Sequence, residues 1–340
     1  MKILEYQGPW QMTVEEAPVP EPGAQEVLLK TLAVGICGGD VHGFTGESGR
    51  RKPGMVMGHE AVGEVVGLGA GVTSLKTGQH VAIFPTLGCG ECTYCKTGWE
   101  HICPNKKILG VNAGRWGAMA EYFTAHTRQS YPIAENAEPA LALLAEPLAV
   151  ATHAVNLMKP AAGDTIAIVG AGTIGLALTL VLGDRGFKNI YILDKIDEKL
   201  ALAERFGARA INVDKEAAAD VLERGTGKRR AQCVFEAVGA EATVRAAYDL
   251  CDFGATAVLV GNLAQEFTLP LQGITSNEIT LRGSYGFTSG DFGEAVGLAE
   301  RNAGHLRELV SGYCTLEETP GVMTELGKGE RQAIKMIIRP

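Results

Sequence analysis

The sequence predicts an α/β protein made of two parts, a β-rich amino-terminal part and a doubly wound parallel sheet. Residues 1 to about 123 contain short strands broken by Gly and Pro, with no long helical period. From residue 164 onward, apolar strands alternate with amphipathic helices, which is typical of a parallel sheet covered by helices. The length of 340 residues agrees with two domains.

The composition is that of a soluble globular protein, with 46% hydrophobic and 21% charged residues. The formal net charge of −8 argues against a nucleic-acid partner, for which a basic surface is expected. Residues 165–183 are uncharged and long enough to suggest a membrane span, but three glycines divide them into strand, turn and helix. The first residues do not resemble a signal peptide. We therefore expect a cytoplasmic protein without a membrane span.

A four-cysteine motif follows the first expected strands, which are residues 27–32, 61–68 and 80–84, with a loop at 18–23. The cysteines are Cys89, Cys92, Cys95 and Cys103. Their spacing allows four thiolates to enclose one zinc ion in a closed, structural site. Disulfides are the alternative, but such short loops strain a bridge, and clustered cysteines in a cytosolic protein more often bind metal. We predict structural zinc, with His101 as a bystander.

A second group of metal-binding side chains lies in residues 35–60 among many glycines. The group contains one thiol, two imidazoles and carboxylates: Cys37, His42, His59, Asp40 and Glu60. A thiolate and an imidazole are good zinc ligands, and a site with three protein ligands keeps a position open for substrate. Taken alone, the alternative is that these are unrelated core residues.

Glu146 lies in an apolar segment, residues 139–158, that is expected to be helical. Pro147 indicates that a new helix begins there, with Glu146 at its N-terminal end. A carboxylate among apolar residues is costly unless it is paired or bound to metal. The alternative is a capping or helix-dipole role, and the sequence leaves both open.

The expected parallel sheet has strands at residues 165–170, 189–194, 210–213, 231–237 and 256–260. The helices between them are expected at residues 171–186, 197–206, 216–224 and 241–250. After residue 261 we expect a strand at 278–284, a helix at 292–302 and a short final strand at 333–338. This tail is expected to return to the first part, because that β-rich part needs closing.

The first turn of this sheet has the motif G-x-G-x-x-G, at Gly170, Gly172 and Gly175. Such a turn lets the backbone approach a pyrophosphate at the N-terminus of the next helix. Asp194 ends the next strand, where a carboxylate binds the adenosine ribose hydroxyls. A glycine-rich turn without ligand is the alternative. Asp194 would repel a 2′-phosphate and so favours NAD over NADP, although Lys195 or Lys199 could attract that phosphate.

These motifs resemble the zinc-containing medium-chain dehydrogenase/reductase family, nearest its polyol (sorbitol-type) and threonine dehydrogenase branches. The likeness spans almost the whole chain, through GICGGDVH, GHEAVGEV, the four-cysteine lobe, EPLAVATHAV and VGAGTIG with Asp194. The family implies a GroES-like β-barrel catalytic domain at residues 1–145, with a structural zinc lobe at 86–105, completed by 285–340. It also implies a Rossmann NAD-binding domain at residues 146–284, with the active site between the domains.

The resemblance implies a catalytic zinc bound by Cys37 and His59, so we expect two zinc ions per chain. Glu60 and Glu146 would supply the remaining coordination, directly or through water. Since neighbouring side chains on a strand point to opposite faces, Glu60 can share the ion with His59 only if the backbone turns there. The expected cofactor-binding residues are Gly170, Gly172, Thr173, Ile174, Gly175, Asp194, Lys199 and Val238.

The expected reaction is hydride transfer from a secondary alcohol, a sugar alcohol or vicinal diol, to NAD, with zinc as Lewis acid. Family members usually carry Ser or Thr two residues after the first zinc cysteine, and that hydroxyl begins the proton relay. This chain has Gly39 there, so the relay would depend on His42 or on ordered water.

Threonine, another amino alcohol or a phosphorylated polyol are alternative substrates. The run Arg50, Arg51 and Lys52 could recognise a phosphate, although such a run is more often a solvated loop. A different class of function is a non-catalytic zinc- and nucleotide-binding protein with a structural or sensory role. The family implies homodimers or homotetramers, in which the edge strand near residues 278–284 often pairs between subunits.

Overall fold

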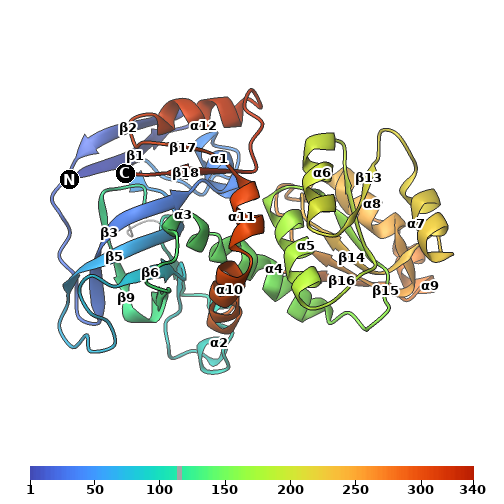
Figure 1. The fold of residues 1–340 in the computed structure, drawn as a ribbon, viewed down its shortest axis with the longest axis horizontal. Helices are drawn as coiled ribbons and strands as arrows, with labels where there is room; N and C mark the ends of the chain where they lie inside the picture. The colour runs from blue at the N-terminus through green and yellow to red at the C-terminus, as the bar shows by residue number, and fades with distance from the viewer. Residues whose placement is uncertain (113–116) are drawn as a thin grey trace. The chain divides into compact units, whose positions relative to one another are not determined.

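The structure is a computed structural model that describes residues 1–112 and 117–340. The chain forms two compact units (Figure 1). The first consists of Met1–Glu146 and Thr288–Pro340, and the second of Pro147–Phe287. The chain therefore leaves the first unit once and returns to it.

The first unit is built on a seven-stranded sheet in the order β10-β6-β5-β3-β18-β17, with β9 also paired to β3. Its strands are β3 (Glu26–Gly35), β5 (Glu60–Leu68), β6 (His80–Ile83), β9 (Tyr122–His126), β10 (Ser130–Pro132), β17 (Val310–Cys314) and β18 (Lys335–Ile338). A three-stranded sheet contains β1 (Lys2–Gly8), β2 (Gln11–Glu16) and β4 (Met55–Val56), and a small one contains β7 (Thr86–Leu87) and β8 (Lys107–Ile108). The expected return of the final strand is confirmed, because β18 pairs antiparallel with β3.

The first unit also contains helical segments, several of which are labelled in Figure 1. They are α1 (Gly38–Phe44), α2 (Thr93–Lys96), η1 (Glu100–Ile102), η2 (Thr127–Gln129), α3 (Pro139–Ala142), α10 (Ser289–Arg301), α11 (Ala303–Leu309) and α12 (Thr319–Gly327). Helices α1, α11 and α12 and strand β17 were not predicted from the sequence. These elements are short, and a glycine-rich segment such as α1 has no apolar helical period to read.

Helix α4 (Ala145–Met158) begins two residues before Pro147, so this proline lies in the first turn rather than opening the helix. Glu146 is in the same first turn, at the N-terminal end, as expected. By length and composition, the stretch Pro139–Met158 could cross a membrane, but 83% of it is buried inside the structure. That burial is typical of a core helix.

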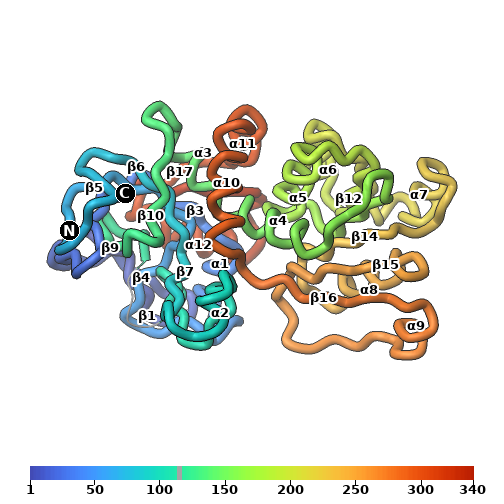
Figure 2. The backbone as a smooth tube through the Cα atoms, turned by 90° about the horizontal axis from the view of Figure 1, so that it is seen from below, coloured from blue at the N-terminus to red at the C-terminus, as the bar shows by residue number. Residues whose placement is uncertain are grey.

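The second unit is a parallel sheet in the order β13-β12-β11-β14-β15-β16, which confirms the doubly wound prediction. Its strands are β11 (Ile166–Val169), β12 (Ile190–Asp194), β13 (Arg209–Asn212), β14 (Ala231–Glu236), β15 (Cys251–Leu259) and β16 (Thr280–Gly283). Its helices are α5 (Thr173–Asp184), α6 (Asp197–Arg205), α7 (Ala218–Thr226), α8 (Glu241–Asp249) and the unpredicted α9 (Leu271–Ser276). Strands β15 and β16 run side by side, with β16 at the edge (Figure 2).

The uncharged run at 165–183 forms β11 and α5 inside this unit, so the division into strand, turn and helix is confirmed. Strand order reverses between β11 and β14, which are neighbours in the sheet. In doubly wound sheets, ligands bind outside the carboxyl ends of the strands at this reversal. The glycine-rich turn follows β11 at that point.

Candidate functional site

The four-cysteine lobe brings its sulfur atoms together without disulfides. All eight cysteines of the chain are free thiols. The Sγ atoms of Cys89 and Cys95 lie 3.9 Å apart, and those of Cys92 and Cys103 lie 3.7 Å apart. A tetrahedron with zinc–sulfur bonds of about 2.3 Å has edges of about 3.8 Å. The four sulfurs therefore fit a closed zinc site.

Local backbone favours the thiolate form of Cys89, whereas burial raises the pKa of Cys95 in the same lobe to about 12. Backbone N–H groups of Glu91 and Cys92 point at the Cys89 sulfur and lower the pKa of that thiol to about 6. The lobe is also tied to the carboxyl-terminal part of its unit, because the backbone N–H of Ser289 donates to Glu100 Oε1 at 2.7 Å. The carboxylate thereby meets the N-terminus of α10, where negative charge is favoured.

A second donor set lies where β3, α1 and β5 meet. Cys37 ends the connection from β3 and caps α1, while His59 directly precedes β5, whose first residue is Glu60. Sγ of Cys37, an imidazole nitrogen of His59 and a carboxylate oxygen of Glu60 all lie within 4.8 Å of one another. One sulfur, one nitrogen and one oxygen are the donor chemistry of a catalytic zinc site. The residues therefore fit zinc.

The backbone turns at Gly58, directly before His59. This glycine has φ +97°, in the left-handed region that other residues avoid. A Cβ here would lie 2.9 Å from the backbone nitrogen of Met119, so the turn is also tightly packed. His59 and Glu60 bring their donor atoms to the same site although they are adjacent in sequence.

Glu60 is buried and paired with a cation from the far end of the chain. Lys335 Nζ donates to both Glu60 carboxylate oxygens, at 2.7 and 2.6 Å, and to the Ile36 carbonyl at 3.2 Å. Gly35 lies opposite Glu60 in the β3–β5 register, and a Cβ at Gly35 would lie 2.2 Å from Glu60 Oε2. The missing side chain leaves room for the carboxylate and its lysine.

Asp40 lies behind the donor set and is fully buried. Its Oδ1 is 3.5 Å from His59 Nδ1 and its Oδ2 accepts the backbone N–H of Cys37 at 3.4 Å. Although burial raises the pKa of Asp40, the charges of His59 and Arg51 hold it at about 2. Burial lowers the pKa of His59, but Asp40 and Cys37 raise it well above its ordinary value. This corner therefore concentrates negative charge toward a cation.

Glu146 is buried near the same cluster but is not one of the donors that converge within 4.8 Å. Burial raises the pKa of Glu146 to about 7, partly offset by His59, while the charge of Glu60 raises it further. A carboxyl group with this pKa exchanges its proton near neutral pH.

The glycine-rich turn of the second unit has the shape required for close backbone approach. Gly170 has φ +103°, and a Cβ at Gly175 would lie 1.8 Å from the Gly170 carbonyl oxygen. A Cβ at Gly172 would meet no atom within 4 Å, so this position opens to space where a phosphate can approach. Thr173 and Ile174 begin α5 directly after it.

Asp194 ends β12 and holds the turn in place. Its Oδ2 accepts the backbone N–H of Ala171 at 2.7 Å, and its Oδ1 accepts those of Lys195 and Ile196. Val238 packs beside the turn, because a Cβ at Gly170 would lie 2.5 Å from Val238 Cγ2. Lys199, half-buried, lies in the first turn of α6. The structure thus brings Asp194 and Val238 to the glycines.

The sequence predicted that the basic run binds a phosphate or forms a solvated loop, and both predictions are wrong for Arg51. Arg50 and Lys52 are exposed, as a solvated loop predicts. Arg51 is buried, and its Nη2 donates to Asp40 Oδ1 at 3.0 Å. Arg51 is therefore neither solvated nor available to a substrate phosphate, because its charge is already committed to a carboxylate.

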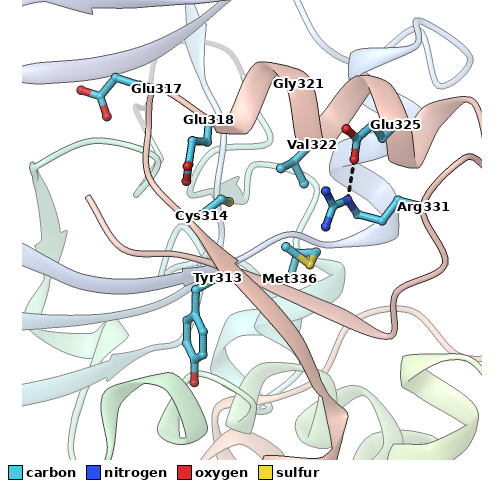
Figure 3. Close-up of a pocket in the computed structure, with 9 residues that line it drawn as sticks. All are labelled: Tyr313, Cys314, Glu317, Glu318, Gly321, Val322, Glu325, Arg331 and Met336. Atoms are coloured by element: carbon cyan, nitrogen blue, oxygen red, sulfur yellow. Dashed lines mark hydrogen bonds and ion pairs between the residues drawn. The ribbon is translucent and has the colours of Figure 1, made fainter.

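A separate pocket of about 440 Å³ lies beside α12 and β17 (Figure 3). Glu317, Glu318 and Glu325 contribute its acidic lining, and Arg331 Nε donates to Glu325 Oε2 at 2.6 Å. None of the predicted site residues lines it. It is thus distinct from both metal-binding clusters.

Asp40, Lys335, Arg51 and Glu47 take part in contacts that the sequence did not predict. Lys335 had a readable signal, since a lysine inside an apolar strand requires a partner. Glu47 lies 2.7 Å from His42 Nδ1 through its Oε2, which nothing in the sequence distinguishes from an ordinary loop carboxylate. The other two become recognisable only when their burial is known.

Family models match a segment in each half of the chain. Residues 23–135 match the family described as alcohol dehydrogenase GroES-like domain, and residues 173–301 match zinc-binding dehydrogenase. D-xylulose reductase A from Aspergillus oryzae is 31% identical over 98% of this chain and 94% of its own length. L-threonine 3-dehydrogenase from Bacillus velezensis is 37% identical over 71% of this chain and 70% of its own length.

A solved structure of an alcohol dehydrogenase from Escherichia coli CFT073, complexed with cofactor NADH, superposes with a TM-score of 0.90. It is 28% identical and covers 100% of this chain and 99% of its own. The fold of the chain agrees with that of this solved structure. The chain belongs to the zinc-containing medium-chain alcohol dehydrogenase family and is a zinc-dependent alcohol oxidoreductase with a nicotinamide cofactor.

Proposed function

We propose that the protein oxidises a secondary alcohol of a sugar alcohol or vicinal diol to the ketone, with NAD as hydride acceptor. The observation that carries this proposal is the convergence of Cys37, His59 and Glu60 within 4.8 Å. The similarity to D-xylulose reductase A supports a polyol substrate. The four-sulfur lobe supplies a second, structural zinc site.

We propose that Cys37 and His59 hold the catalytic zinc, and that Glu60 and Glu146 complete its coordination in turn. Zinc bound there supplies a Lewis acid that lowers the pKa of an alcohol. Lys335 donates to both oxygens of Glu60 and would balance the charge of this carboxylate whenever zinc does not bind it. Glu146, with its pKa raised to about 7 mainly by burial, can take or release a proton in the same range.

The proton released by the alcohol is proposed to leave through His42. Gly39 offers no hydroxyl, but His42 follows it by one turn of α1, on the same side of the helix. Glu47 Oε2 lies 2.7 Å from His42 Nδ1, so a proton on Nδ1 leaves Nε2 free to accept another. Glu47 thereby orients the acceptor that replaces the missing hydroxyl.

The cofactor is proposed to be NAD, bound over the glycine-rich turn with its adenosine ribose at Asp194. Both oxygens of this carboxylate already accept backbone N–H groups, which fixes its orientation. A fixed negative charge at this point disfavours a 2′-phosphate. The gap at Gly172 leaves the backbone open to the pyrophosphate, and Thr173, Ile174, Lys199 and Val238 complete the proposed contacts.

The two units are proposed to act as a catalytic domain, residues 1–145 with 285–340, and an NAD-binding domain, residues 146–284. The boundaries of the compact units, at Glu146 and Thr288, support this division. We also propose a cytoplasmic homodimer or homotetramer. Eight free thiols suit a reducing compartment, and β16 offers an exposed edge strand for pairing. Light scattering would measure the assembly.

An amino alcohol such as threonine is a second candidate substrate, favoured by the 37% identity to L-threonine 3-dehydrogenase. A phosphorylated polyol is less favoured, because Arg51 is committed to Asp40 and only Arg50 and Lys52 of the run remain exposed.

A spectrophotometric screen tests the proposal directly. The zinc-loaded protein is given NAD or NADP with polyols, polyol phosphates, vicinal diols and amino alcohols, and cofactor reduction is followed. We expect reduction of NAD with at least one polyol or diol, and loss of that activity in Cys37→Ser. Activity confined to amino alcohols would replace the substrate class. If the protein binds two zinc ions but reduces neither cofactor with any of these alcohols, a non-catalytic role would be favoured.

A further inference from the structure

We propose that Arg51 is a positioning residue for the catalytic zinc site, acting on His59 and Cys37 through Asp40. The inference rests on the proposed zinc binding by Cys37 and His59. It concerns a residue that contacts neither the metal ligands nor a substrate. Its proposed role follows from the position of its guanidinium group, which is buried beside α1.

Arg51 differs from its neighbours although the three residues have the same charge. Arg50 and Lys52 are exposed, whereas the Arg51 side chain is only 4% exposed. Its Nη2 donates to Asp40 Oδ1 at 3.0 Å and its Nη1 to the Val111 carbonyl at 3.5 Å. A buried guanidinium is costly unless it is paired, and Asp40 supplies that pairing.

Helix α1 is shaped to admit this side chain. A Cβ at Gly43 would lie 2.6 Å from Arg51 Cγ and 3.1 Å from its Nε. Gly43 has an ordinary backbone conformation, so the reason for a glycine here is space rather than a turn. The path of Arg51 past α1 is therefore built into the same short helix that Cys37 caps.

Asp40 connects the arginine to both proposed zinc ligands. The oxygen that accepts from Arg51 also lies 3.5 Å from His59 Nδ1, and the other oxygen accepts the Cys37 N–H at 3.4 Å. A carboxylate facing one nitrogen of a metal-binding histidine fixes its ring orientation and leaves the other nitrogen for the metal. Since Arg51 and His59 share one oxygen, the arginine determines where that oxygen lies.

Loss of the Arg51 side chain should therefore weaken zinc binding at this site. Partners in the shell behind metal ligands typically contribute 10- to 100-fold to metal affinity or activity. We expect Arg51→Met to weaken the catalytic zinc by about 10- to 100-fold. Arg51→Lys, which keeps the charge but not the fork of donors, should fall in between.

The test is a chelator competition on the full-length protein, followed by metal analysis of the retained zinc. Each chain has an internal reference, because the four-cysteine lobe should keep its ion in every variant, and far-UV circular dichroism reports whether the protein is folded. Arg50→Met is the matched control: it removes the same charge from the adjacent, exposed position and should leave both zinc affinities unchanged. Gly43→Ala should reproduce part of the Arg51→Met effect by displacing the arginine stem.

A spectroscopic measurement separates positioning from general loosening. Cobalt in place of the catalytic zinc gives absorption bands that depend on ligand geometry, and we expect these bands to shift in Arg51→Met but not in Arg50→Met. Unchanged affinity and unchanged bands in a folded Arg51→Met protein would overturn the inference. If the wild-type protein itself binds only the lobe zinc, the proposed catalytic metal site is wrong, which is a different result.

Discussion

The two proposed zinc sites of the first unit are built in opposite ways. The lobe takes its four sulfurs from Cys89 to Cys103, and their spacing alone brings them into range. The other site uses three kinds of donor atom, and its supporting charges come from a loop and from the final strand, 275 residues after Glu60. A closed site with identical ligands can be specified locally. A site with mixed ligands and buried charges depends on distant parts of the fold to hold those charges.

The difference extends to electrostatics. The lobe relies on backbone N–H groups, which lower the pKa of Cys89, and it is half-exposed. The Cys37 site is buried among ionised side chains, with Lys335 and Arg51 opposite Glu60 and Asp40. Removing one partner of such a pair leaves a charge without compensation in the interior. The second site should therefore tolerate single substitutions among its supports poorly.

The largest contrast is expected between Cys92→Ser and Cys37→Ser. Loss of a lobe sulfur removes a structural ion, which in small zinc-folded modules supplies on the order of 10 kcal/mol, so the melting temperature should fall by at least about 10 °C. Cys37→Ser should abolish activity and change the melting temperature little. Metal analysis should find one zinc in each variant. Equal thermal losses in the two variants would contradict the division into structural and catalytic sites.

The next effect concerns the buried pair between Lys335 and Glu60. In a Cys37→Ser background, which lacks the catalytic zinc, Lys335→Met leaves the Glu60 carboxylate buried without a counter-charge and should reduce the free energy of unfolding by about 3–5 kcal/mol. The double variant Lys335→Met with Glu60→Gln removes both charges and should recover much of that loss. Urea unfolding of all three proteins measures the difference. A double variant as unstable as the single one would show that Lys335 acts through packing alone.

A smaller effect is predicted for Glu146. Burial raises the pKa of this carboxyl group from an ordinary 4.5 to about 7. Between these values the native carboxyl holds a proton that the unfolded chain has released. Stability therefore decreases as the pH rises through this range, by up to about 3 kcal/mol. The measurement is urea unfolding from pH 4.5 to 8 in a Cys37→Ser background, which lacks the catalytic zinc.

Glu146→Gln should flatten that pH dependence, because an amide does not titrate. Glu135→Gln, at an exposed position on the preceding loop, is the control and should leave the dependence unchanged. A slope that survives in Glu146→Gln would assign the proton to another group of the cluster.

The smallest effect is expected on the proton route. Glu47→Ala should slow turnover by about 10-fold, less than the roughly 10²-fold for His42→Ala, because it disturbs only the orientation of the imidazole. Glu47→Gln keeps a hydrogen-bond acceptor for Nδ1 and should retain most activity. Nitrogen chemical shifts of ¹⁵N-labelled histidine would report the change of tautomer in Glu47→Ala.

Gly39→Ser offers a way to sharpen this last test. A Cβ at Gly39 would lie 3.7 Å from Cys37 Sγ, an ordinary contact, so the hydroxyl can be restored without a clash. With that hydroxyl present, the cost of Glu47→Ala should shrink. An identical cost in both backgrounds would place Glu47 outside the proton route.

Much of this architecture could be predicted because it depends on local pattern. The period of apolar residues from 164 onward predicted the parallel sheet, and the spacing of four cysteines predicted the lobe. The glycine motif followed by Asp194 located the nucleotide turn for the same reason. Each of these signals lies within a few tens of residues.

What could not be predicted depends on tertiary contacts. Arg50, Arg51 and Lys52 are chemically alike, and only the gap at Gly43 determines which of them is buried. The pairing of Lys335 with Glu60 depends on β18 lying beside β3. The short helices α1 and α12 have too little amphipathic length to be read from sequence.

The position of Lys335 in β18 has a consequence for how the protein is made. During synthesis on the ribosome, the cysteine lobe can fill with metal as soon as residues 89–103 have emerged. Glu60 and the site around it must wait for a strand translated 275 residues later. A nascent chain that stalls before β18 would thus hold its structural ion, but its catalytic centre would be incomplete. Glu60 in such a chain would lack Lys335, its counter-ion.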